Sequence, residues 1–299
     1  MNKIKFKGIM PALITPFNDN GKLIKSSVKQ LVDLHLSQGV DGFYTCGSTG
    51  EGPAIRKELR MDMAEATMDA VAGRGVVIAH IGAPNIFDAI DLTRHATKIG
   101  VDAISSLPPM YTFKYTEEEL IDYYKTIADN TDKPIIVYAT NMMEKMNVTR
   151  ILTKLLEIDK IIGVKFTIRD YFRMRQVKEI NGGNINLING PDETLLCGLT
   201  MGADGGIGTT YNVMAPWFVA LYSAYIKGDI RKAEELQHKI DLGVEILIRY
   251  SKNGAIKATK EALNLMGINV GNAVYPAAPL SKDESQSLKK ELQDIGVEF

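Results

Sequence analysis

Two apolar patterns alternate along the chain at a regular spacing. Short runs rich in β-branched residues predict strands, and the longer segments between them carry apolar residues at helical spacing. Between the first two runs, for example, Val28, Leu31 and Val32 fall on one face of a predicted helix. The predicted strands are 8–15, 40–46, 75–81, 101–107, 134–140, 161–167, 185–190 and 203–209.

Eight strand–helix units of this kind predict an α/β fold. Strands that alternate with helices are typical of a parallel sheet, and a count of eight favours a closed (β/α)8 TIM barrel over an open doubly wound sheet. Three more helical patterns follow the eighth unit, at about 229–250, 254–266 and 282–295. We therefore predict a barrel domain over 1–228 and a C-terminal three-helix extension over 229–299.

One position in the sixth predicted strand breaks the apolar pattern. Lys165 lies in the run IIGVKFTIRD, where an ammonium group is costly to bury. On an edge strand its ammonium group would remain in water, and this segment alone leaves that alternative open. A closed barrel has no edge, and alternate residues of its strands face the interior. We expect Gly163, Lys165 and Thr167 to face the interior, and Ile162, Val164 and Phe166 to pack beneath the helices.

Polar side chains also follow the second and fifth predicted strands, at the barrel end where such enzymes place their chemistry. In the loop CGSTGEG (46–52), Ser48, Thr49 and the backbone N–H groups suit the binding of a carboxylate. The alternative is a glycine-rich loop that only caps the next helix. Tyr138 ends the fifth strand, where its phenol suits a proton shuttle, although a buried structural tyrosine is the alternative.

Three other strand ends add candidate residues. Asp192 and Glu193 follow the seventh strand and suit a polyhydroxylated ligand, but Asp192 as a helix N-cap is an alternative. Thr209 offers a hydroxyl after the eighth strand, within the glycine-rich GADGGIGTTYN. The loop LPPMYTFKY carries Tyr111, which reaches a site or subunit interface unless it packs on the surface.

Composition excludes several classes of function. A net charge of −1 over 299 residues, with no basic stripe, indicates neither a nucleic-acid partner nor a membrane surface. The two cysteines lack metal-ligand spacing and the four histidines are scattered, so we expect no metal. No leader segment or long apolar run is evident, and we expect a cytoplasmic protein. Nucleotide-phosphate loops and a G-x-S-x-G elbow are missing, which leaves a covalent lysine mechanism.

Several segments form a set of motifs that is specific in combination: GSTGE (47–51), the pair Tyr138 and Lys165, VKFT (164–167) and GADGGIGTTYN (202–212). On these residues the chain resembles, throughout its length, the N-acetylneuraminate lyase and dihydrodipicolinate synthase superfamily of pyruvate-dependent class I aldolases. The synthase branch has an arginine where this chain has Met143, so the resemblance favours the lyase branch. Asn141 departs from the family pattern, which has proline there.

The resemblance implies reversible cleavage of N-acetylneuraminate to N-acetylmannosamine and pyruvate, through a Schiff base on a neutral Lys165. It implies that Tyr138 carries the proton, that Ser48 and Thr49 bind the carboxylate, and that Ser48 relays protons toward Tyr138 and a neighbouring subunit's Tyr111. It implies a homotetramer and no organic cofactor. The residues implied to hold the sugar are Thr167, Gly190, Asp192, Glu193, Gly208 and Thr209.

Three alternatives to this function remain at this stage. The nearest is a sister aldolase that acts on a shorter 2-keto-3-deoxy sugar acid, or a synthase with altered carboxylate binding. A barrel that holds pyridoxal phosphate on Lys165 is a second, and a non-catalytic sugar-acid-binding barrel is the third. A substrate panel tests the sister aldolase, visible absorbance of the purified protein tests bound pyridoxal phosphate, and calorimetry tests binding without pyruvate release.

Overall fold

Eight parallel strands form a single sheet in the computed structural model, which describes residues 6–109, 115–143, 146–252 and 254–299. Every observed strand lies inside a predicted one, so all eight predicted strands are confirmed. The order in the sheet is β1-β8-β7-β6-β5-β4-β3-β2. The strands are β1 Gly8–Pro11, β2 Gly42–Thr45, β3 Val76–His80, β4 Ala103–Ser106, β5 Ile135–Ala139, β6 Ile161–Phe166, β7 Asn186–Asn189 and β8 Gly205–Gly208.

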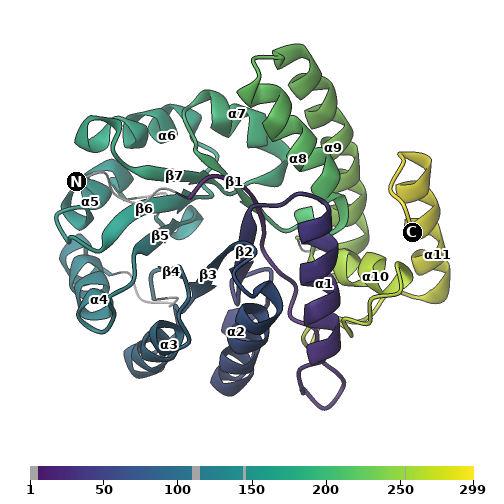
Figure 1. Ribbon diagram of the computed structural model, residues 1–299, viewed down its shortest axis with the longest axis horizontal. Helices are drawn as coiled ribbons and strands as arrows, with labels where there is room; N and C mark the ends of the chain where they lie inside the picture. Colours follow the sequence, from purple (N-terminus) through teal and green to yellow (C-terminus); the bar gives the residue numbers. More distant parts are fainter. Residues whose placement is uncertain (1–5, 110–114, 144–145, 253) are drawn as a thin grey trace.

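The two ends of this sheet, β1 and β2, meet and complete the barrel. Asp41 N–H donates to the Ile9 carbonyl at 2.9 Å, and Leu13 N–H donates to the Tyr44 carbonyl at 2.9 Å. Figure 1 shows the helices arranged around the strands. The predicted TIM barrel is therefore confirmed, and β6 has a neighbouring strand on each side, β5 and β7. The edge-strand alternative for Lys165 is wrong.

Within the described residues, one α-helix follows each strand, and three more α-helices come after α8. The C-terminal helices agree with the predicted ranges to within two residues at each end. Gly52–Ala54 form a 3₁₀ turn after the GSTGE loop, and the next α-helix begins at Lys57. The helices are α1 Lys25–Ser37, α2 Lys57–Val71, α3 Ile86–Lys98, α4 Glu117–Asp129, α5 Val148–Leu155, α6 Tyr171–Lys178, α7 Leu195–Thr200, α8 Tyr211–Ile226, α9 Ile230–Ser251, α10 Ile256–Leu265 and α11 Lys282–Asp294.

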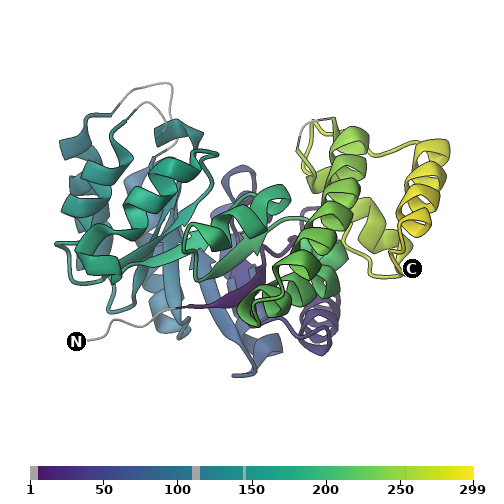
Figure 2. The ribbon, with the colours of Figure 1, turned by 90° about the horizontal axis from the view of Figure 1, so that it is seen from above.

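The three C-terminal helices lie together at one side of the barrel (Figure 2). α9 packs along α8, and α10 and α11 pack against α9 in turn. One stripe of α9 is apolar and buried, including Ala233, Ile240 and Leu247. Gln237 from the same stripe accepts from Leu196 N–H at 2.9 Å and so ties α9 to the start of α7.

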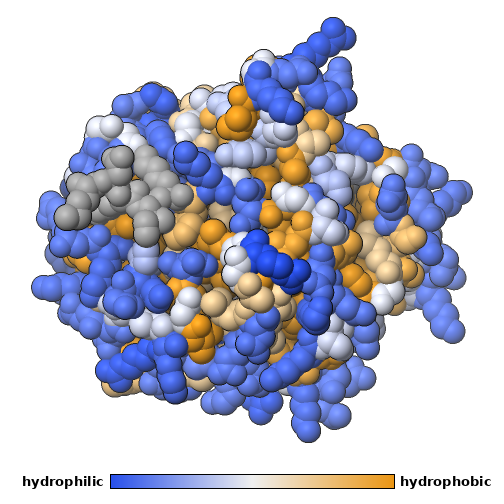
Figure 3. Space-filling model, viewed as in Figure 1, coloured by the Kyte–Doolittle hydropathy of each residue, from blue (hydrophilic) through white to orange (hydrophobic). Residues whose placement is uncertain are grey.

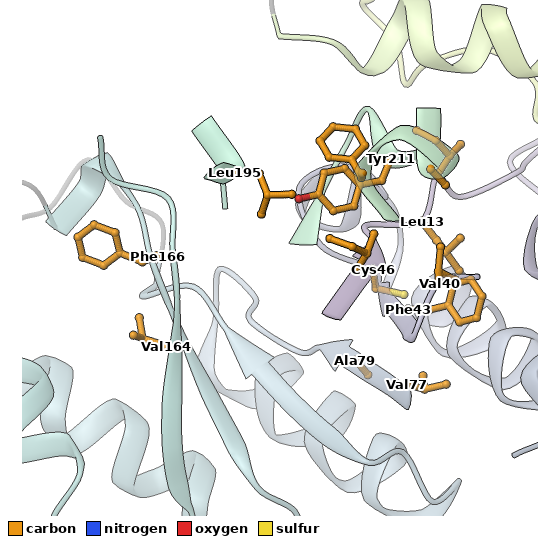
Figure 4. Close-up of a cluster of buried hydrophobic side chains, with 14 of the residues drawn as sticks. Leu13, Val40, Phe43, Cys46, Val77, Ala79, Val164, Phe166, Leu195 and Tyr211 are labelled. Atoms are coloured by element: carbon orange, nitrogen blue, oxygen red, sulfur yellow. The ribbon is translucent and has the colours of Figure 1, made fainter. Parts of the chain in front are cut away.

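Apolar side chains form two separate layers on the two faces of the barrel strands. The outer layer lies between strands and helices and contains Val164 and Phe166, which Figure 4 shows on one side of β6. The inner layer fills the barrel and takes one side chain from every strand. Its strand residues are Met10, Tyr44, Ile78, Ala103, Ile136, Ile162, Ile188 and Ile207.

The expected position of Ile162 beneath the helices is wrong. Ile162 belongs to the inner layer because the register between β5 and β6 shifts: Ile135 pairs with Ile161, but Ile136 pairs with Gly163. The extra residue in β6 is a bulge, which interrupts strict alternation. Beyond it alternation resumes, and Lys165 is the register partner of Tyr138.

The face of the molecule seen in Figure 1 is not uniformly polar. Figure 3 shows apolar side chains toward the middle of this face and hydrophilic ones around its rim. Within the described residues, no helix is both long enough and apolar enough to cross a membrane.

Candidate active site

Lys165 lies inside the barrel near the carboxyl end of β6. Its side chain is 5% exposed, and its Nζ lies 4.3 Å from the ring centroid of Tyr138 and 4.6 Å from that of Tyr44. Two aromatic faces stabilise a cation on this nitrogen through their quadrupoles. This is an environment that suits an amine or an iminium ion and separates it from bulk water.

Tyr138 is the nearest group with an acidic proton on the neighbouring strand. Burial raises the pKa of Tyr138, but the charge of Lys165 and the nearby polar groups of Ser48 and Thr167 outweigh burial and leave the pKa below its ordinary value. A phenol of lowered pKa gives up and regains a proton more readily near neutral pH.

The loop after β2 is held by bonds to two other strand ends. Thr49 and Thr209 hydroxyls lie 2.7 Å apart, and Thr15 Oγ1 donates to the Gly50 carbonyl at 2.6 Å. The loop does not cap α2, whose N-cap is Arg56. Ser48, within this loop, is exposed and lines a cavity of about 390 Å³ that Leu107, Thr140 and Ile256 also line.

Thr167 and Gly190 approach each other at the ends of β6 and β7. Thr167 N–H donates to Ala139 O and Gly190 N–H donates to Phe166 O, each at 2.9 Å, so the strand pairing continues to the mouth. A Cβ on Gly190 would lie 2.1 Å from Thr167 Oγ1. Glycine is therefore required by close approach at this position.

Asp192 is buried and bonded to the loop after β8. Its Oδ2 accepts from the N–H and the Oγ1 of Thr210, both at 2.7 Å. Burial raises the pKa of Asp192 to about 6, against the lowering effect of the Thr210 bonds. A Cβ on Gly208 would lie 2.0 Å from Asp192 Oδ1. The N-cap alternative is wrong, since α7 begins at Leu195 and the carboxylate bonds Thr210.

Glu193 follows β7 and is paired with a cation. Arg169 Nε and Nη2 both donate to Glu193 Oε1, at 2.9 and 2.5 Å. Arg169 also lines a cavity of about 220 Å³ together with Asn141, Thr167 and Pro191. The neighbouring Met143 is 1% exposed and belongs to the outer apolar layer, so this position offers no charge for a second carboxylate.

Two aromatic residues of the site were not among the predicted residues. Tyr44 and His80 place their rings 6.2 Å from each other and each 6.2 Å from the Tyr138 ring. Tyr44 OH donates to Ser105 Oγ at 3.0 Å, and Leu107 N–H donates to His80 Nε2 at 3.1 Å. Burial, with the charges of Arg60 and Lys165, holds the pKa of His80 well below its usual value. Tyr44 belongs to the inner layer, and His80 lies two residues after Ile78 of that layer, so closure of the barrel turns both inward.

The remaining predicted site residues fall into two groups. Tyr111 lies outside the described residues. The other predicted residues lie at or just after the carboxyl ends of β2, β5, β6, β7 and β8, at one end of the barrel. Within the described residues no cluster of three or more histidine, cysteine, aspartate or glutamate side chains is arranged to hold a metal ion.

The chain matches known proteins over nearly its whole length. The model of the dihydrodipicolinate synthetase family matches residues 5–295. A curated N-acetylneuraminate lyase of Rhizobium meliloti (strain 1021) is 33% identical over 292 residues, covering 98% of this chain and 96% of the relative.

Solved structures of the same family also match the chain over nearly its whole length. A crystal structure of N-acetylneuraminate lyase from Mycoplasma synoviae has a TM-score of 0.89 and 32% identity, covering 98% of this chain and 99% of that one. YagE, a prophage protein of the dihydrodipicolinic acid synthase family from E. coli K12, was solved in complex with pyruvate. It has a TM-score of 0.90 and 28% identity, covering 98% of this chain and 99% of that one.

Proposed function

Since the chain belongs to the dihydrodipicolinate synthetase family, we propose that it is a lyase that cleaves N-acetylneuraminate reversibly to N-acetylmannosamine and pyruvate. The observation that carries this proposal is the position of Lys165 Nζ, buried in the barrel and 4.3 Å from the Tyr138 ring. An amine in this position can form an imine with a 2-oxo acid, and the neighbouring phenol can move the protons.

The reaction begins when the neutral Lys165 amine attacks the C2 ketone of the open-chain sugar acid. Loss of water forms a protonated imine, which accepts electrons when the C3–C4 bond breaks. Tyr138 takes the C4 hydroxyl proton, with help from the substrate carboxylate, and releases the aldehyde N-acetylmannosamine. The enamine then regains a proton at C3 from Tyr138, and water hydrolyses the imine to free pyruvate and Lys165.

Other residues bind and orient the substrate. Ser48 and Thr49 hold its carboxylate, and Ser48 relays protons toward Tyr138 and Tyr111 of a neighbouring subunit. The faces of Tyr44 and Tyr138 stabilise the iminium cation. Lys165 supplies the electrophilic catalysis, so we propose that no metal or organic cofactor takes part. We also propose that the protein is a cytoplasmic homotetramer. The residues proposed to hold the sugar tail are Thr167, Gly190, Asp192, Glu193, Gly208 and Thr209.

Borohydride reduction in the presence of pyruvate tests the central step. We expect intact-protein and peptide mass spectra to show one pyruvyl adduct, on Lys165. The Lys165→Ala variant should lose both the adduct and turnover while keeping its fold. A matched control is Lys160→Met, which removes a half-buried lysine whose Nζ donates to the Ala128 carbonyl. If the wild-type chain carries no adduct on Lys165, the aldolase proposal is wrong.

Two observations support a second candidate, a sister aldolase for a different sugar acid. The Glu193 carboxylate proposed to accept from the sugar tail is already paired with Arg169. Asn141, where the family has proline, lines a cavity together with Arg169. A coupled pyruvate-release assay on N-acetylneuraminate and on shorter 2-keto-3-deoxy sugar acids decides between the two. Faster turnover of a shorter acid would favour the sister activity.

A further inference from the structure

A buried ion pair connects the C-terminal helices to the loop that is proposed to bind the substrate carboxylate. Lys260 Nζ, from α10, lies 2.7 Å from Oε2 of Glu51, the last residue of GSTGE. The side chains are 1% and 8% exposed. The pair joins segments that are far apart in the sequence, and neither residue is proposed to contact the substrate.

Both charges of this pair have further partners. Glu51 Oε1 accepts from Val274 N–H at 2.6 Å, and Lys260 Nζ donates to the Asn272 carbonyl at 2.8 Å. Lys260 Nζ also lies 3.7 Å from the ring centroid of Phe17. Burying two charges is costly unless each is paired and hydrogen-bonded, and these partners meet that condition. The Glu51 carboxylate therefore has one fixed position.

That position in turn fixes the backbone of the loop. Glu51 has a φ of 56°, in the left-handed region that non-glycine residues rarely adopt, and its N–H donates to the Ser48 carbonyl at 3.0 Å. The next residue closes the same turn, since Gly52 N–H donates to the Gly47 carbonyl at 3.0 Å. A strained residue persists only where its surroundings hold it, and here the side chain is anchored by α10 and the segment after it.

We propose that Glu51 and Lys260 are positioning residues for the reaction: the C-terminal helices hold the GSTGE turn in shape so that Ser48 and Thr49 can receive the substrate carboxylate. This inference rests on the proposed function. It gives the C-terminal extension a role in substrate binding, although the pair itself does not reach the reacting atoms. A misplacement of about 1 Å in a binding group is enough to reduce catalysis strongly.

Variants of the pair test this role by pyruvate titration. Glu51→Gln keeps the shape and an acceptor for Val274 N–H, and Lys260→Met keeps the length without the charge. The measurement is the fraction of Lys165 trapped by borohydride against pyruvate concentration, well below the unfolding temperature. We expect half-saturating pyruvate to rise about tenfold in both variants, with the maximal adduct unchanged. In contrast, Lys260→Arg keeps the charge and should restore at least part of the affinity.

Leu263→Ala is the matched control, since Leu263 is fully buried in α10 and lies outside the pair. We expect both Leu263→Ala and Lys260→Met to lower the thermal stability, but Leu263→Ala should leave the half-saturating pyruvate concentration unchanged. If Leu263→Ala and the pair variants weaken pyruvate binding equally, or if the pair variants bind like the wild type, the positioning role is wrong. If the wild-type chain itself forms no adduct on Lys165, the proposed function fails, and the inference fails with it.

Discussion

Asp192 provides a test of the electrostatics of the barrel mouth that does not depend on the substrate. Its carboxylate is buried and accepts two hydrogen bonds from Thr210, and burial raises its pKa from the usual 3.8 to about 6. We consider Asp192→Asn, which has nearly the same shape. The amide oxygen can still accept from Thr210, but the side chain no longer ionises.

The sign of the expected effect follows from linkage. A carboxylate whose pKa is raised by folding contributes stability that is complete below the unfolded value and is lost as the pH rises through the folded value. The rise from 3.8 to about 6 corresponds to about 3 kcal/mol. Part of this change lies below pH 4, so the free energy of unfolding of Asp192→Asn, minus that of the wild type, should increase by about 2.4 kcal/mol between pH 4 and pH 8.

Urea denaturation at pH 4, 5, 6, 7 and 8, at one protein concentration, measures this difference. Other titrating groups act equally in both chains and cancel in the subtraction. Asp132→Asn, at an exposed position before β5, controls for the loss of one negative charge. A difference between Asp192→Asn and wild type that is constant with pH, or that falls above pH 6, would refute the reasoning.

Three further predictions concern proton transfer, packing and a buried histidine. Tyr138→Phe should lower kcat, measured by steady-state kinetics, by about 10²- to 10⁴-fold. Mass spectrometry should show that borohydride still traps pyruvate on Lys165 in this variant. Loss of the adduct would contradict a pure proton-transfer role. Gly190→Ala places a Cβ 2.1 Å from Thr167 Oγ1 and should lower the free energy of unfolding, measured by urea denaturation, by about 1–3 kcal/mol. It should also reduce sugar turnover more than it weakens pyruvate binding. Unchanged stability would contradict this packing argument. Burial lowers the pKa of His35 to about 4. The free energy of unfolding of the wild type should therefore fall by about 3 kcal/mol relative to that of His35→Leu as the pH falls from 6.5 through 4. Stability curves of the two chains that run parallel with pH would contradict this.

The fold was predictable because its signal is local and repeated. Eight apolar runs at regular spacing gave all eight strands, each somewhat longer than the observed strand. The main error, at Ile162, arose at a bulge between β5 and β6, which no pattern within β6 reveals. Alternation beyond the bulge still placed Lys165 inside the barrel, because β6 returns to strict register with β5 at Tyr138.

Several features of the site depend on segments that are distant in sequence. Asp192 bonds Thr210 and Glu193 pairs with Arg169, although both carboxylates were predicted only as acceptors at the mouth. Tyr44 and His80 were overlooked because aromatic residues inside strands are usually core, and only the closed barrel turns them toward Lys165.

By itself, the sequence determined the order and type of the elements, the inward parity of Lys165 and the motifs that indicate an aldolase. These depend on side-chain periodicity and on short segments, which a single chain records directly. The tertiary structure decided which charges meet: Glu51 with Lys260, Arg169 with Glu193, and Lys165 with the two aromatic faces. Such pairs form only when barrel closure and packing of the C-terminal helices remove water from groups that are far apart in the chain.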